Sequence, residues 1–111
     1  IIFGQGRQTR DFLYVVDAVN AAILAVDAPS RSIYNIGANK EISVNSLLSL
    51  MSKISRLKTK PNFKPFRPGE IIKSRVDFSK AKKELGWQPK ISLEKGIERT
   101  LKWFEEDHLP R

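Results

Sequence analysis

No cysteine occurs in this sequence of 111 residues, and it contains only one histidine. The chain therefore forms no disulfide, no thiolate zinc site and no cysteine nucleophile, and most metal sites and Ser-His-Asp arrangements are excluded. Its longest aliphatic run, residues 21–26, is far shorter than the ~20 residues that cross a bilayer. The first residues also lack the basic and apolar regions of a signal peptide. We therefore expect no metal, no membrane contact and a cytoplasmic location.

Several motifs of catalytic and cofactor chemistry are also missing. Gly4 and Gly6 are not followed by a third glycine, because Thr9 stands at that position of a Gly-x-Gly-x-x-Gly pattern. Neither Tyr14 nor Tyr34 is followed by lysine four residues later, and there is no Walker A or His-Glu-x-x-His motif. We therefore predict no catalytic residue and no bound cofactor for this segment alone.

The length and composition are those of one domain or a part of one. A hydrophobic fraction of 41% argues against disorder, and a chain of this size should bury ~60–70% of its unfolded surface in one modest core. Because the sequence begins without methionine, directly in an apolar segment, we expect a fragment whose N-terminal part is missing.

Apolar residues at three- and four-residue steps predict four helices. We expect the first to begin near Asp17 and to stop at Pro29, and two later helices to be capped by Ser43 and Ser92. A short helix from residue 79 to 85 should end at Gly86.

Strands are predicted at residues 1–3, 11–15, 32–36 and 74–78, which are rich in β-branched and aromatic residues. Residues 58–69 contain three prolines and should be extended or looped. The alternation of strands and helices in the first half predicts an α/β fold, mixed α+β in isolation.

Charge is distributed unevenly. Residues 1–50 carry four basic and four acidic groups, so the net charge of +8 resides entirely in residues 51–111. Between Lys53 and Lys83, eleven basic groups accompany only two acidic ones. Such a segment attracts phosphorylated ligands or polyanions, although a solvated lysine surface that only keeps the protein soluble is the simpler interpretation.

Two arginines stand in settings that core packing does not explain. Arg10 lies where a glycine turn meets a strand, and Arg67 lies in a Pro-Gly loop. A guanidinium presents paired donors that match phosphate oxygens, and Glu70, three residues after Arg67, could accept hydrogen bonds from a diol such as a ribose. The alternative is that both arginines only pair with Asp11, Asp17 or a C-terminal glutamate.

At these residues the sequence resembles the NAD-dependent nucleotide-sugar epimerases and dehydratases of the extended short-chain dehydrogenase/reductase family, closest to UDP-glucose 4-epimerase-like proteins. The resemblance covers nearly the whole chain and rests on motifs that follow the family's order. They are GQGRQTRDFLYVVD at residues 4–17, YNIG at 34–37, RPGE at 67–70, SKA and LGWQP at 79–89, and SLEKG at 92–96.

The resemblance implies the C-terminal, substrate-binding part of an extended Rossmann-type enzyme, without its NAD-binding glycine loop. Residues 1–38 would complete the Rossmann sheet and residues 39–111 would form the substrate-binding subdomain. The intact parent would use NAD to oxidise a sugar carbon and return the hydride after rearrangement. The expected partners are a nucleoside-diphosphate sugar, with UDP favoured, and the missing N-terminal Rossmann domain.

By motif match, Arg10 and Arg67 would hold the diphosphate, Glu70 the ribose hydroxyls, and Asn35 the diphosphate or adjoining backbone. Asp11, Asp17 and Trp87 match positions interpreted as structural. A dTDP- or GDP-sugar dehydratase and a UDP-glucuronate decarboxylase remain as alternatives within the family.

Two interpretations of another class remain open. A basic nucleic-acid-binding module is disfavoured because the sequence has no recognisable reading helix, ribonucleoprotein motif or zinc ligands. An inert remnant without a ligand is the other. Without the Rossmann sheet the apolar stripe of the first helix would be uncovered, so we expect self-association or marginal stability.

Overall fold

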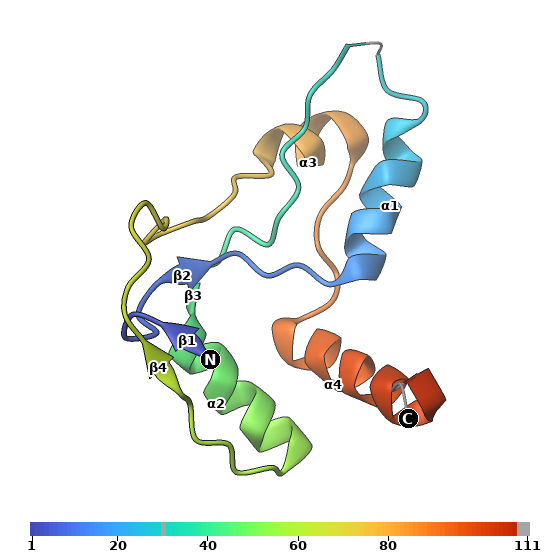
Figure 1. Cartoon of the computed structure of the whole chain (residues 1–111). Helices are drawn as coiled ribbons and strands as arrows, with labels where there is room; N and C mark the ends of the chain where they lie inside the picture. Colours follow the sequence, from blue (N-terminus) through green and yellow to red (C-terminus); the bar gives the residue numbers. More distant parts are fainter. Residues whose placement is uncertain (30, 109–111) are drawn as a thin grey trace.

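The computed structural model describes residues 1–29 and 31–108, and in these ranges it combines helices with two small sheets, as the sequence predicts. Figure 1 shows the helices in two groups, α1 beside α3 and α2 beside α4. The helices are α1 (Val15–Ala25), α2 (Val44–Ser55), α3 (Ser79–Leu85), α4 (Leu93–Trp103) and the π-helical turn η1 (Phe104–His108). The strands are β1 (Ile2–Phe3), β2 (Thr9–Arg10), β3 (Ile42–Ser43) and β4 (Phe63–Lys64).

Each sheet pairs two strands that lie far apart in the sequence. β1 runs parallel to β4, with Ile2 opposite Phe63, whereas β2 runs antiparallel to β3, with Arg10 opposite Ile42. Both pairs join residues 1–38 to residues 39–111. The first ten residues are thereby fixed between β3 on one side and the extended segment that follows α2 on the other.

Local signals set the bounds of three helices, as predicted. The hydroxyls of Ser43 and Ser92 accept hydrogen bonds from the backbone N–H groups of Ser46 and Lys95, which caps α2 and α4. Gly86 ends α3 with φ = 66°, a left-handed conformation that glycine adopts without a steric cost.

Three local predictions were wrong. Asp17 does not cap α1: the helix begins two residues earlier, after Tyr14, and Asp17 is a buried acceptor for a distant loop. α1 also ends at Ala25, before Pro29. The strands predicted at 11–15, 32–36 and 74–78 do not form. Residues 11–14, 32–36 and 74–78 have no ladder partner in the described structure, and Val15 already begins α1.

The core is smaller than the length of the chain leads one to expect. Among the described residues only Ile2, Ala21, Ala81 and Trp87 are buried hydrophobic residues. The accessible surface is 8734 Å², against about 6,200 Å² for a compact monomer of this mass. The radius of gyration is 16.5 Å, against about 13 Å expected. The prediction of one modest core that buries most of the surface was therefore too generous.

The outer surface of α1 is apolar and uncovered in the described structure. Val19 is 50% exposed and Ile23 61% exposed, although both belong to the predicted apolar stripe. The helix instead buries Ala21 and Asp17 on the side that packs against α3 and Trp87.

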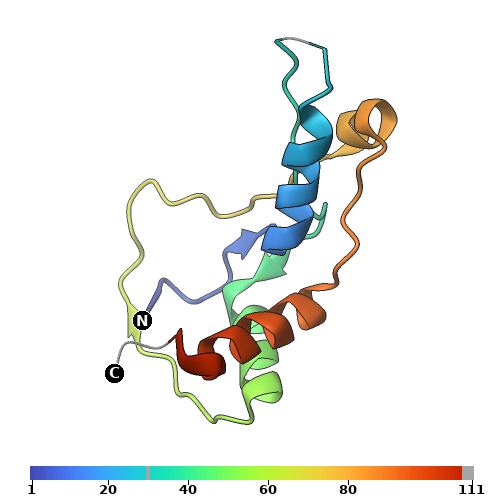
Figure 2. The ribbon, with the colours of Figure 1, turned by 90° about the vertical axis from the view of Figure 1, so that its right-hand side faces the viewer.

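The second helix pair packs loosely. Figure 2 shows α4 lying beside α2. A groove of ≈ 530 Å³ remains between them, and its apolar lining includes Leu48, Met51, Ile97 and Leu101. No helix in the described part of the chain is long and apolar enough to cross a membrane.

Candidate functional site

A polar cluster lies where β2 meets the segment that follows β4. Arg10 Nη1 donates hydrogen bonds to the carbonyl oxygens of Ile71 (2.6 Å) and Thr9 (2.7 Å). Arg10 Nη2 lies 3.4 Å from Glu70 Oε1, and the two side chains are 33% and 21% exposed. Residues 60 positions apart in the sequence are thus joined at the surface of the small β2–β3 sheet.

Glu70 is used on one oxygen only. Its Oε1 accepts from Arg10, whereas its Oε2 is buried and has no hydrogen-bond partner among the described residues. A buried carboxylate oxygen without a donor costs free energy, and such groups are rare in folded proteins. A hydroxyl-bearing ligand could satisfy this oxygen after a local shift of residues 67–70 exposes it, because the oxygen is closed to solvent in the described structure.

Arg67 lies in the same loop but faces another group. Its guanidinium carbon lies 3.5 Å from the centroid of the Phe3 ring, a cation–π contact between the loop and β1. The Glu70 N–H also donates to the Arg67 carbonyl (3.2 Å), which folds residues 67–70 into a turn. The structure thus brings Arg67 and Glu70 into one turn that is attached to β1 and β2.

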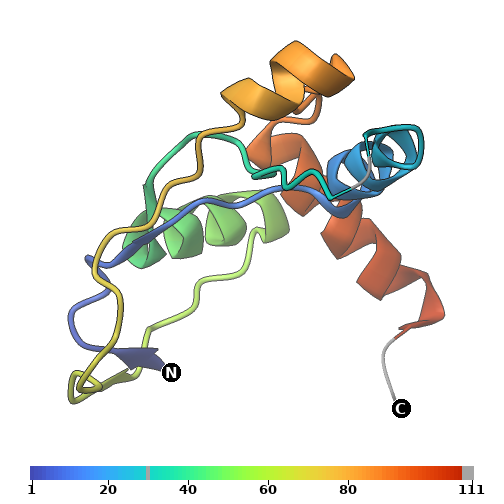
Figure 3. The same cartoon turned by 90° about the horizontal axis from the view of Figure 1, so that it is seen from above.

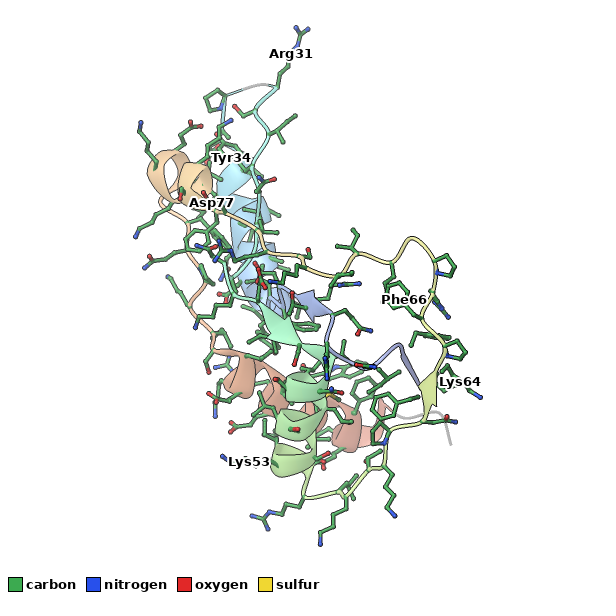
Figure 4. The ribbon with its side chains drawn as sticks, turned by 90° about the vertical axis from the view of Figure 1, so that its left-hand side faces the viewer. Arg31, Tyr34, Lys53, Lys64, Phe66 and Asp77 are labelled. Atoms are coloured by element: carbon green, nitrogen blue, oxygen red, sulfur yellow. The ribbon has the colours of Figure 1, made fainter. Side chains whose placement is uncertain are left out.

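The loop containing these residues projects from the body of the molecule. Figure 3 shows this segment with β1 and β4 on the opposite side from α1, and Figure 4 shows Lys64 and Phe66 on its outer course. Phe66 packs against Gly4, where an added Cβ would lie 3.0 Å from the ring. The whole of residues 61–69 is exposed, so ligands have access to it.

Asn35 is not brought into this cluster. It is exposed in the segment that precedes Gly37, and the described contacts connect it neither to Arg10 nor to Arg67 or Glu70. Its segment is instead fixed from the other side by Asp11, whose carboxylate accepts from the backbone N–H groups of Ala38 and Asn39 (both 2.9 Å).

The alternative pairing of the arginines with Asp11 or Asp17 is not observed. Besides its two bonds to residues 38 and 39, Asp11 accepts from the Val76 N–H (3.0 Å), and Asp17 accepts from Lys90 and Ile91. Both aspartates therefore bind backbone groups, which agrees with their interpretation as structural. Trp87 is likewise structural, because its Nε1–H donates to the Asp17 carbonyl at 2.9 Å.

Gln8 was missed by the sequence reasoning. It is buried, and its side-chain Nε2 donates to the carbonyl of Phe3 at 2.8 Å across the Gly4–Gly6 turn. Gln8 thereby fixes the residue on which Arg67 rests. The only signal in the sequence was its place between a glycine turn and a strand, where a polar side chain is more often exposed.

The basic segment between Lys53 and Lys83 has few internal counter-charges. Its two acidic residues are already occupied, since Glu70 binds Arg10 and Asp77 accepts hydrogen bonds from Ser79. Its lysines and arginines are exposed. The loop that contains Arg67 and Glu70 is therefore surrounded by positive charge, which attracts anionic ligands.

Comparison with known proteins gives consistent results. The family model described as GDP-mannose 4,6 dehydratase matches residues 1–100. A UDP-glucuronate 4-epimerase of Thermodesulfobacterium geofontis is 36% identical over 96% of this chain and 33% of its own length. Among further relatives are a dTDP-glucose 4,6-dehydratase and UDP-glucuronic acid decarboxylases.

Solved structures agree with these relatives. A UDP-glucose 4-epimerase of Thermotoga maritima, solved with UDP-glucose, has a TM-score of 0.90 and 41% identity, over 95% of this chain and 34% of that one. A UDP-glucuronic acid 4-epimerase of Bacillus cereus, in complex with UDP-glucuronic acid and NAD, has a TM-score of 0.85 and 33% identity over 95% of this chain and 34% of that one. The chain spans about a third of the length of these proteins.

Proposed function

Because the chain belongs to the family of GDP-mannose 4,6-dehydratase and related NAD-dependent nucleotide-sugar epimerases and dehydratases, we propose that it binds the nucleoside diphosphate of a nucleotide sugar. UDP is the favoured nucleotide, since the similar proteins named above include epimerases of UDP-glucose and UDP-glucuronate. The parent activity proposed is that of a UDP-hexose 4-epimerase. The dehydratases and decarboxylases among the relatives mark the alternatives.

The observation that carries this proposal is the buried, unpartnered Oε2 of Glu70 beside the Arg10 guanidinium. A ribose hydroxyl supplies the missing donor, while the arginine presents cationic donors to a phosphate nearby. Each charge-assisted hydrogen bond contributes ~1.5–3 kcal/mol. In the proposed complex, Glu70 binds the ribose and Arg10 and Arg67 bind the diphosphate, with Asn35 on the diphosphate or adjoining backbone.

The described residues do not fit NAD. The Gly4–Gly6 turn leads into strand β2 and not into the N-terminus of a helix, where dinucleotide phosphates bind. Its second glycine is also occupied, because an added Cβ at Gly6 would collide with the Asn45 side chain. NAD, which the Bacillus cereus structure contains, is therefore assigned to the part of the family fold that lies outside this chain.

The proposal assigns residues 1–38 to the completion of the Rossmann sheet and residues 39–111 to substrate binding. Support comes from α1, whose exposed apolar face has no covering element in the described structure. The solved relatives are about three times as long, so they contain additional chain that would cover such a face. Without that cover, we expect the apolar face to drive self-association.

Light scattering tests this last point. The molar mass in solution should exceed that of a monomer. Val19→Asp, which places a charge at the centre of the apolar face of α1, should lower the molar mass toward that of a monomer. A matched change on the other side of the molecule, Ser49→Asp on α2, should leave the association unchanged. A monomeric chain with a high melting temperature would contradict the expectation.

Titration of the chain with UDP, dTDP and GDP, followed by amide NMR shifts, tests the binding function. We expect UDP to bind best, and Arg10→Ala and Arg67→Ala each to abolish binding that is detectable in the unaltered chain. Unchanged affinity in both variants would refute the assignment. Absence of any shift would favour an inert remnant, and salt-dependent binding of random oligonucleotides in place of UDP would favour a nucleic-acid-binding module.

A further inference from the structure

Most of the donors of Arg10 are committed within the protein. A guanidinium has five N–H donors, and three contacts are made here: two from Nη1, to the carbonyls of Thr9 and Ile71, and one from Nη2 to Glu70. Two donors therefore remain for a ligand. Phosphate binding alone does not explain why the Arg10 guanidinium contacts Ile71 and Glu70.

The turn that carries Glu70 has few other attachments. Residues 61–69 are exposed, and an added Cβ at Gly69 would meet nothing within 4 Å. Beyond Arg10, the described contacts that fix this turn are the internal Glu70–Arg67 backbone bond, the Arg67–Phe3 stacking and the bond from the Thr9 N–H to the Ile72 carbonyl. Among the described residues, only Arg10 makes an ion pair or hydrogen bond with the carboxylate of Glu70.

We propose that Arg10 is a positioning residue for Glu70, in addition to its contact with the diphosphate. Its guanidinium bridges β2 to both the backbone and the carboxylate of residues 70–71, and so holds the unpartnered Glu70 oxygen in place for the ribose. This inference rests on the proposed function, because it assigns Glu70 to the ribose. It goes further in predicting that the nucleoside and diphosphate parts of the ligand are coupled through one arginine.

A ligand without phosphate separates the two roles of Arg10. Uridine has the ribose but no diphosphate, so a purely phosphate-binding arginine would not affect its affinity. We expect Arg10→Ala to weaken uridine binding about tenfold or more, which is the loss of one charge-assisted hydrogen bond, in NMR titrations of the full chain. Lys73→Ala is the matched control: it removes an exposed positive charge from the same basic segment and should leave uridine binding within a factor of two.

The conservative variant sharpens the test. In Arg10→Lys the charge is retained, but a single ammonium cannot bridge Ile71 and Glu70 as the planar fork does. Uridine affinity should therefore stay low in this variant while part of the UDP affinity returns. Equal uridine affinity in the unaltered chain and in Arg10→Ala would overturn the proposal, and so would an equal loss in Lys73→Ala.

A second measurement needs no ligand. If Arg10 holds the turn, Arg10→Ala should accelerate hydrogen exchange at the backbone amides of Thr9 and Glu70 several-fold, while the amide of Ala38, bound by Asp11, keeps its rate. Unchanged exchange at both amides would overturn the positioning role. Failure of the unaltered chain to bind either uridine or UDP, with the exchange effect present, would instead refute the proposed function and leave the positioning of Glu70 established.

Discussion

Two carboxylates in different regions of the molecule, Asp17 and Glu70, differ in how completely their oxygens are hydrogen-bonded. Asp17 is 1% exposed, and one of its oxygens accepts from the backbone N–H groups of Lys90 (3.1 Å) and Ile91 (2.9 Å). Glu70 receives one long contact from Arg10 and leaves its other oxygen buried without a donor. The first carboxylate joins α1 to the segment before α4, whereas the second has one oxygen without a donor among the described residues.

The difference separates Asp17, a structural acid, from Glu70, the acid proposed to bind ligand. Around Asp17, the Trp87 indole bonds to the Asp17 carbonyl, and its ring packs edge-on against Phe78 at 5.6 Å between centroids. This is the region where the small hydrophobic core lies. Around Glu70, by contrast, the neighbouring chain is exposed and basic, so the fold contributes access and charge there and little packing.

The largest effect is expected from removing the structural acid. Asp17→Ala would leave two backbone N–H groups without their acceptor, and at ~1–3 kcal/mol for each the free energy of unfolding should fall by about 2–5 kcal/mol. Urea denaturation followed by circular dichroism measures the loss. Asp17→Asn, which keeps one acceptor oxygen, should cost about 1 kcal/mol; equal losses in both variants would show that the charge matters and the hydrogen bonds do not.

The next effect concerns the indole that meets Asp17. Trp87→Phe keeps an aromatic ring but removes the donor to the buried Asp17 carbonyl and some packing volume, so we expect a loss of about 1–3 kcal/mol. Thermal unfolding checks it. Trp103→Phe is the control: Trp103 is 50% exposed, and its replacement should cost less. A larger loss at Trp103 would contradict the placement of the core around α1 and α3.

The fold could be predicted wherever its cause is local. Ser43, Ser92 and Gly86 set the ends of their helices through hydrogen bonds and a left-handed φ within a few residues. Of the two-residue strands only β1 was predicted, at residues 1–3. β2, β3 and β4 were missed, because each exists only through a partner strand more than thirty residues away. Asp17 was misinterpreted as a cap for the same reason, since its partners are more than seventy residues away in the sequence.

The candidate site was predicted only as a set of residues, and the structure leaves one of them, Asn35, outside the cluster. The guanidinium chemistry of Arg10 and Arg67 and the carboxylate of Glu70 could be chosen from the sequence, but the contact of Arg10 with the Ile71 carbonyl could not. Backbone carbonyls have no sequence signature. The role of Gln8, which holds the Phe3 carbonyl, escaped prediction for the same reason.

A smaller effect on stability is expected at the binding acid. Exposed or half-exposed ion pairs contribute ~0.2–1 kcal/mol, so Glu70→Gln should change the free energy of unfolding by less than about 1 kcal/mol. Ligand affinity should respond more strongly: we expect uridine to bind the variant about tenfold more weakly, because a carboxylate acceptor is lost. Denaturation and titration of the same sample compare the two. A stability loss as large as that of Asp17→Ala would make Glu70 a structural acid as well.

The smallest effect on stability is expected at Asp77, an exposed carboxylate that accepts hydrogen bonds from Ser79. The hydroxyl and then the backbone N–H of Ser79 donate to it and lower its pKa in the folded chain. Because the folded pKa lies below the unfolded one, its stabilisation is complete above the unfolded pKa and is lost as the pH falls through the folded pKa.

The carboxylate of Asp77 is hydrogen-bonded but exposed, whereas that of Asp17 is both hydrogen-bonded and buried. Comparing the two therefore separates the effect of hydrogen bonding from that of burial. Asp77→Asn should lower the melting temperature slightly at pH ~6 and make no difference at pH ~2, where the unaltered carboxyl is protonated too. Thermal unfolding of both chains across this pH range measures the difference in their melting temperatures, which should disappear toward acid. Ser79→Ala, which removes the hydroxyl donor, should make this difference smaller. A difference in melting temperature that stays constant or grows toward acid would contradict this expectation. It would mean that hydrogen bonds to an exposed carboxylate do not stabilise its charged form in this protein.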